Sequence, residues 1–101
     1  MKEHVKKILV TGGASGIGAA ICRRMSDSNS HFLVHTRANK AGLEKTIRDI
    51  EKNGGRAKAE FADLALKGAA RLLIQRAIEC LGGLDVLVAN AGYALKTPIT
   101  D

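Results

Sequence analysis

A glycine-rich stretch directly after an apolar run is the feature that most restricts how this chain can fold. Residues 11–18 read TGGASGIG, and residues 5–10 before them read VKKILV, which is typical of a buried β-strand. Apolar residues between positions 17 and 25 then recur at the spacing of a helix. We therefore expect a strand that ends near Val10, a glycine-rich turn, and a helix that begins within residues 15–18.

The same alternation of strand and helix patterns continues along the 101 residues. Apolar spacing predicts two more helices and three more strands, the helices around residues 43–50 and 66–81 and the strands at residues 31–35, 56–61 and 84–89. A chain that alternates in this way forms a parallel sheet with helices packed on its faces. We therefore predict one α/β domain with an open sheet of four parallel strands.

The position of the glycines predicts a phosphate-binding turn. Ligands of open α/β sheets bind at the carboxyl ends of the strands, where helix N-termini offer unpaired N–H groups and a partial positive charge. Gly12 would allow the tight turn, Gly16 the close approach of a phosphate, and Gly18 the packing of the helix on the strand. Ser15 can add a hydroxyl donor. A glycine-rich turn that binds no ligand is the alternative.

The glycine spacing also excludes several other sites. The order Gly12-x-x-x-Gly16-x-Gly18 differs from the common G-x-G-x-x-G fingerprint. A Walker A loop would need Lys and Ser or Thr after the last glycine, where this chain has two alanines. A nucleophile elbow would need glycine at Ile17, so Ser15 is not predicted to be a nucleophile.

Three segments together resemble the short-chain dehydrogenase/reductase family. Residues 11–18 match its TGxxxGxG cofactor loop. Asp63-Leu64 resembles the family's aspartate that contacts the adenine ring, and Asn90-Ala91-Gly92 resembles its NAG motif beside the cofactor. The resemblance implies a Rossmann-type fold, of which residues 1–101 would be the N-terminal half with four strands. Within the classical type, the sequence is similar to the 3-oxoacyl-carrier-protein reductases.

The residues after the second predicted strand indicate which dinucleotide would bind. Rossmann proteins that prefer NAD(H) place Asp or Glu near this point to bind the ribose 2′-hydroxyl. Here the matching residue is Thr36, and Arg37 can form a charge-assisted pair with a 2′-phosphate. We therefore predict NADP(H) rather than NAD(H), although Arg37 could also be a solvated residue at a strand end.

The cofactor-binding residues predicted from these motifs lie in the loops after the four strands. They are Gly12, Ser15, Gly16, Ile17, Gly18, Thr36, Arg37, Asp63, Leu64, Asn90, Ala91 and Gly92. For Asp63 the alternative is a helix N-cap for the segment that begins near Leu66.

No catalytic residue is predicted in this chain. The classical family carries its acid–base chemistry on Ser and a Tyr-x-x-x-Lys motif, whereas the one tyrosine here is Tyr93 and the next lysine is Lys96, three residues later. We therefore expect an N-terminal cofactor-binding fragment of an NADP(H)-dependent oxidoreductase that reduces a carbonyl or oxidises an alcohol. Association into homo-oligomers is expected only of the complete protein.

Two other functions are weighed against this one. The chain could be a non-catalytic module that binds a nucleotide or a protein partner. The net charge of +6 could instead indicate nucleic-acid binding, but the basic residues are dispersed and Phe32, Phe61 and Tyr93 are the only aromatic residues, so nucleic acid is not expected.

Composition and spacing exclude further classes. No apolar run approaches membrane-spanning length, and no signal-peptide core is present. Cys22 and Cys80 fit neither zinc nor CxxC spacing, and we expect buried or half-buried thiols in a cytoplasmic protein. His31 and His35 are expected to be surface or partly buried strand residues, so no metal site is predicted.

The missing Tyr-x-x-x-Lys motif gives a prediction for activity. The 101-residue chain should not oxidise NADPH in the presence of a ketone, because general acid–base catalysis typically contributes about 10²–10⁴-fold. Absorbance at the NADPH band would follow the reaction. Turnover that is sensitive to Tyr93→Phe would contradict the prediction.

Overall fold

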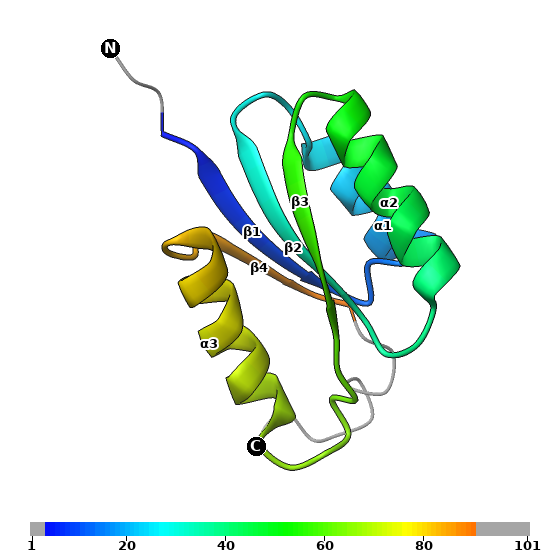
Figure 1. Cartoon of the computed structure of the whole chain (residues 1–101), viewed down its shortest axis with the longest axis vertical. Coiled ribbons are helices and arrows are strands. Elements are labelled where there is room, and N and C mark those ends of the chain that lie inside the picture. The colour runs from blue at the N-terminus through cyan, green and yellow to red at the C-terminus, as the bar shows by residue number, and fades with distance from the viewer. Residues whose placement is uncertain (1–3, 91–101) are drawn as a thin grey trace.

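The computed structural model describes residues 4–90, which alternate strictly between strand and helix (Figure 1). The four strands form one parallel sheet in the order β3-β2-β1-β4. In chain order the elements are β1 (Lys6–Thr11), α1 (Gly16–Met25), β2 (Ser30–Thr36), α2 (Lys40–Lys52), β3 (Arg56–Phe61), α3 (Ala69–Leu81) and β4 (Val86–Ala89). The predicted Rossmann-type arrangement of an open parallel sheet with flanking helices is confirmed.

The strand order reverses at β1. The chain moves outward from β1 to β2 and β3, and α3 then carries it back across the sheet to β4, on the other side of β1. Figure 1 shows α1 and α2 on one face of the sheet and α3 on the other. A reversal of this kind leaves a crevice at the carboxyl ends of the two diverging strands, which is where open α/β sheets bind ligands.

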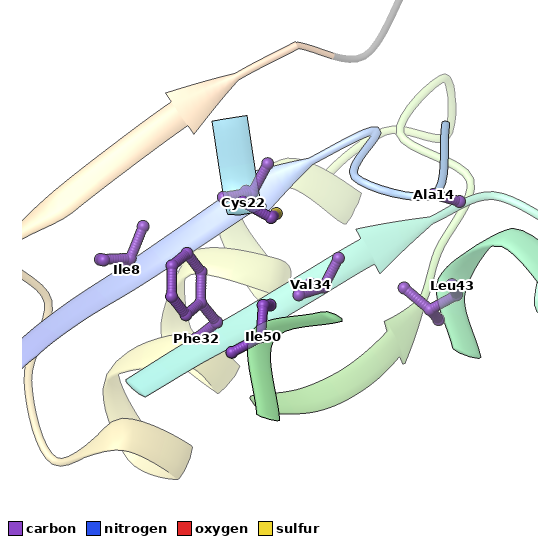
Figure 2. Packing of buried hydrophobic residues seen from close by; sticks show 8 residues of the cluster. Ile8, Ala14, Cys22, Phe32, Val34, Leu43 and Ile50 are labelled. Atoms are coloured by element: carbon purple, nitrogen blue, oxygen red, sulfur yellow. The ribbon is translucent and has the colours of Figure 1, made fainter. Parts of the chain in front are cut away.

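The larger hydrophobic cluster fills the space between the sheet and the helices α1 and α2 (Figure 2). Cys22 of α1 is fully buried in it, and burial raises the pKa of this thiol to about 12. The thiol therefore stays protonated and packs as an apolar group. The buried members of the cluster are Ile8, Val10, Ala14, Cys22, Phe32, Val34, Leu43 and Ile50.

A second cluster lies on the opposite face, under α3. Leu73, Ala77 and Leu81 follow one another at intervals of four residues, so they line one stripe of the helix. They pack on Leu9 and Leu33, the central residues of β1 and β2. The sheet is therefore covered on both faces at its centre, as a parallel sheet requires.

The third helix, the fourth strand and one thiol differ from the predictions. The third helix begins at Ala69 and not at Leu66, because Gly68 before it has a left-handed φ of 82° that interrupts the helix. The fourth strand begins at Val86, two residues later than expected. Cys22 is buried as expected, but Cys80 is exposed, so that part of the prediction is wrong; both are free thiols.

Asp85 ties the start of β4 to β1. Its backbone N–H donates to the Lys7 carbonyl at 2.8 Å, and its carboxylate accepts from the Lys7 N–H at 2.9 Å. His4 Nε2 also lies 2.7 Å from this carboxylate. The Lys7 N–H and the His4 ring hold the pKa of Asp85 below its ordinary value.

The two edges of the described sheet differ in character. The β3 edge carries exposed charged residues, Arg56 and Lys58 among them, which discourage pairing with another sheet. The β4 edge is apolar, and Leu87 is 46% exposed there. Because an exposed apolar edge strand templates pairing, the 101-residue chain is expected to associate non-specifically through β4, which is distinct from a homo-oligomer of the complete protein.

The substitution Leu87→Lys should therefore weaken self-association of the 101-residue chain by about tenfold or more. Sedimentation velocity over a range of protein concentrations would measure the effect. Leu72→Lys is the matched control, because Leu72 is 49% exposed but lies on α3. Equal effects of the two substitutions, or a chain that stays monomeric at all concentrations, would contradict a role for the β4 edge.

Candidate functional site

The predicted site residues within positions 4–90 lie together at the carboxyl edge of the sheet. The glycine-rich turn follows β1, Arg37 follows β2, Asp63 lies just beyond β3 and Asn90 follows β4. Because parallel strands share one carboxyl edge, these loops meet beside the point where the strand order reverses. Ala91, Gly92, Tyr93 and Lys96 lie outside the described residues.

The glycines of the turn have backbone conformations or contacts that other residues would not tolerate. Gly12 has φ of 66° and Gly16 has φ of 57°, both in the left-handed region. A Cβ added at Gly18 would lie 2.1 Å from the Gly12 carbonyl oxygen. The first turn of α1 therefore packs directly on the backbone that leaves β1.

Hydrogen bonds from three other elements satisfy the backbone of Gly12 and Gly13. The Gly12 N–H donates to His35 Nδ1 at 3.1 Å, and its carbonyl accepts from Asn90 Nδ2 at 3.3 Å. The Gly13 N–H donates to the His35 carbonyl at 2.8 Å, and its own carbonyl accepts from Thr46 Oγ1 at 2.8 Å. The turn is therefore fixed from β2, α2 and the end of β4 at once.

The N-terminus of α1 is exposed at Ser15, Gly16 and Ile17, whereas Gly18 is buried against the turn. Ser15 is the N-cap residue, but its side chain makes no capping hydrogen bond. The first N–H groups of a helix have no acceptors within it. No acidic residue lies in the first turn of α1. These groups form a binding position for an anion such as a phosphate.

The side chains of Arg37 and Asp63 face each other across the ends of β2 and β3. Arg37 is 70% exposed, and its Nε lies 3.9 Å from Asp63 Oδ2, which is a long and weak ion pair. The other oxygen, Asp63 Oδ1, accepts from the Ala65 N–H at 3.0 Å. An anion that approached Arg37 would therefore compete only with a weak intramolecular partner.

Asp63 does not cap the third helix, so that alternative is wrong. Gly68 is the N-cap residue of α3, and Asp63 instead stabilises a turn that ends at Leu66, whose N–H donates to the Asp63 carbonyl at 3.0 Å. The next residue, Leu64, packs against the cluster under α3. The side chain of Leu64 thus serves the core beside the site.

Thr36 is buried at the end of β2, and its hydroxyl has a local partner. Thr36 Oγ1 accepts from the Asn39 N–H at 3.3 Å. Asn39 in turn caps α2, because its Oδ1 accepts from the Gly42 N–H at 3.0 Å. The residue at the end of β2 is thus a threonine and not an acidic residue, and Arg37 follows it.

Asn90 joins β4 to β1 through two groups. Its backbone N–H donates to Thr11 Oγ1 at 2.8 Å, and its side-chain amide donates to the Gly12 carbonyl. Thr11 Oγ1 also lies 3.4 Å from the Val88 carbonyl, to which it donates. These bonds hold the two strands together at the edge where the strand order reverses.

His35 and Thr46 are parts of this site that sequence reasoning missed. His35 was expected at or near the surface, but it is 2% exposed and bonds the turn. Residues two apart in a strand lie on the same face, and Leu33, two residues earlier, lies on the buried α3 face of β2. This spacing is the sequence signal that His35 is buried. Thr46 lies three residues after the buried Leu43 and four before Ile50, so helical periodicity places it in the core.

Residues 4–90 contain neither a metal-binding cluster nor a membrane-spanning helix. No group of three or more His, Cys, Asp or Glu residues in this part of the chain is arranged to hold a metal ion. No helix described here is long and apolar enough to cross a membrane.

The fold is of the Rossmann type, with a glycine-rich turn and a helix N-terminus at the reversal of the strand order. The model of the short chain dehydrogenase family matches residues 6–101. The chain belongs to this family.

Relatives from several bacteria share between a third and two fifths of the residues. A 3beta-hydroxysteroid dehydrogenase of Eggerthella lenta is 34% identical over 92% of this chain, and glucose 1-dehydrogenase 2 of Bacillus subtilis is 34% identical over 87%. A solved short chain dehydrogenase from Burkholderia cenocepacia, in complex with NADP, is 39% identical over 87% of this chain with a TM-score of 0.80.

The chain is much shorter than these relatives. It spans 36% of the steroid dehydrogenase, 34% of the glucose dehydrogenase and 36% of the Burkholderia cenocepacia chain. The similarity therefore covers the part of the family fold that contains the glycine-rich turn.

The close packing at Gly18 gives a prediction for stability. Gly18→Ala should lower the free energy of unfolding by about 1–3 kcal/mol, because its Cβ would overlap the Gly12 backbone. Urea denaturation would measure the loss. Arg24→Ala, at an exposed position of the same helix, should change stability by less than about 0.5 kcal/mol. A Gly18→Ala variant as stable as Arg24→Ala would show that the turn can move aside.

Proposed function

We propose that this chain binds NADP(H) for an oxidoreductase that reduces a carbonyl group or oxidises an alcohol. The observation that carries the proposal is the exposed N-terminus of α1, which stands on a turn whose own backbone groups are bonded within the protein. Such a turn can bind a pyrophosphate without losing its internal hydrogen bonds.

The described residues fit a dinucleotide. Gly16 has open space around its backbone, since an added Cβ would meet no atom within 4 Å. The Ser15 side chain makes no capping hydrogen bond, so its hydroxyl can donate to a phosphate. The Asp63 carboxylate, in the loop after β3, can accept a hydrogen bond from an adenine amine. When bound, the nicotinamide would supply or accept the hydride, and the residues described here would hold the adenosine and pyrophosphate parts.

Arg37 supports a preference for NADP(H) over NAD(H). Its guanidinium is exposed, and its ion pair with Asp63 is weak, with 3.9 Å between Arg37 Nε and Asp63 Oδ2. A 2′-phosphate would form a charge-assisted and potentially bidentate pair with it. Thr36 carries no carboxylate to bind a free 2′-hydroxyl, and its hydroxyl already accepts from the Asn39 N–H. The relative from Burkholderia cenocepacia, solved in complex with NADP, is consistent with this proposal.

The names of the relatives support the reaction class but differ in substrate. A hydroxysteroid and glucose, and the acetoin of a solved dehydrogenase from Enterobacter cloacae that is 33% identical with a TM-score of 0.81, all carry alcohol groups. We therefore propose alcohol and carbonyl chemistry for the complete protein. The likeness to 3-oxoacyl-carrier-protein reductases and the cytoplasmic location stay predictions.

Arg37→Ala tests the cofactor preference. The loss of a hydrogen bond to a charged group costs about 1.5–3 kcal/mol, so NADPH should bind roughly tenfold to over a hundredfold more weakly, while NADH binding stays nearly unchanged. Calorimetric titrations of the chain with each dinucleotide would measure both constants.

Arg24→Ala is the matched control, because it removes an exposed arginine at the far end of α1 and the same unit of charge. It should leave the NADPH affinity within about twofold, provided that the effect of Arg37 is local. Equal losses for NADPH and NADH, or tighter binding of NADH by the unchanged chain, would refute the assignment.

A further inference from the structure

The His35 side chain lies buried between two loops of the proposed site. Its Nδ1 accepts from the Gly12 N–H at 3.1 Å, at the start of the glycine-rich turn. Its Nε2 lies 2.8 Å from the carbonyl oxygen of Ala62, the residue before Asp63. One imidazole therefore bridges the loop after β1 and the loop after β3.

The two contacts require a particular form of the ring. The Gly12 N–H is a donor, so Nδ1 must carry a lone pair, and the Ala62 carbonyl is an acceptor, so Nε2 must carry the proton. Only the neutral imidazole with its proton on Nε2 satisfies both partners. A protonated ring has two donors and no acceptor, and it would lose the bond to Gly12.

Backbone contacts of the same strand reinforce the bridge. The His35 carbonyl accepts from the Gly13 N–H at 2.8 Å, and the Thr36 carbonyl accepts from the Ala62 N–H at 3.2 Å. Both neighbouring loops are thus attached to the end of β2 by backbone and by the His35 ring. Arg37 is only two residues further along, so the loops after β1, β2 and β3 are all positioned by the end of β2.

We propose that His35 is a positioning residue, which sets the glycine-rich turn and the Asp63 loop at the spacing that the adenosine part of the nucleotide needs. The proposal rests on the proposed function for its ligand. It goes beyond that function because His35 itself is buried and acts through Gly12 and Ala62.

Two conservative substitutions separate the two contacts. The amide oxygen of His35→Asn can replace Nδ1 and keep the Gly12 bond, but its side chain is too short to reach Ala62. The amide nitrogen of His35→Gln can replace Nε2 and keep the Ala62 bond. His35→Leu keeps neither contact, and Leu33→Val is the matched control, because it thins the same buried face of β2 away from both loops.

Hydrogen exchange of the free chain tests the bridge without any ligand. We expect faster exchange at the Gly12 amide in the Gln and Leu variants, and faster exchange at the Ala65 and Leu66 amides, which bond Asp63, in the Asn and Leu variants. Leu33→Val should change these amides only in proportion to its global stability. The same increase at both loops in every variant, the control included, would overturn the proposal.

Titration with NADPH tests the consequence for binding. His35→Leu should weaken NADPH binding by about tenfold, and the Asn and Gln variants by about two- to fivefold each, as expected for the loss of two or one neutral hydrogen bonds. An affinity in His35→Leu equal to that of Leu33→Val would overturn the positioning role. Failure of the unchanged chain to bind NADPH would overturn the proposed function and the nucleotide role of His35, whereas the exchange pattern alone decides whether the ring couples the loops.

Discussion

Hydrogen bonding of two consecutive glycines is the constraint on which the rest of this structure depends. Gly12 and Gly13 leave the central strand with four polar backbone groups, and a tight turn cannot pair them with one another. Side chains of His35, Thr46 and Asn90, together with the backbone of β2, supply the partners. The order of the strands is what brings residues from these three distant segments to one turn.

The same constraint explains why the N-terminus of α1 is available for a ligand. The polar backbone groups of Gly12 and Gly13, which precede the helix, are bonded inside the protein. Gly16 and Ile17 at the start of the helix are exposed, and the N-cap residue Ser15 makes no side-chain capping bond. The loop after β1 thus has two parts: Gly12 and Gly13 are fixed by hydrogen bonds, and residues 15–17 are exposed. Arg37 and Asp63 extend the open part along the ends of β2 and β3, where their weak pairing leaves the guanidinium exposed.

The fold could be predicted from the sequence because its signals are local. Apolar patterns predict every described strand and helix, and the C-cap residue of α2, Asn53, is followed by two glycines, a residue type that commonly ends helices. The start of α3 was missed by three residues, because the left-handed conformation of Gly68 depends on the turn before it. The role of His35 could not be predicted, because its partners Gly12 and Ala62 are 23 and 27 residues away and meet it only through strand pairing.

The pairing of β1 with β4 also has a consequence for the order of folding. Contacts among β1, β2 and β3 close loops of moderate length, so the turn, His35 and the Asp63 loop can come together before β4 pairs with β1. The bond from Asn90 to Gly12 spans 78 residues and carries a larger entropic cost of loop closure. During synthesis, the loops after β1, β2 and β3 would therefore come together before β4 pairs with β1 and Asn90 bonds Gly12.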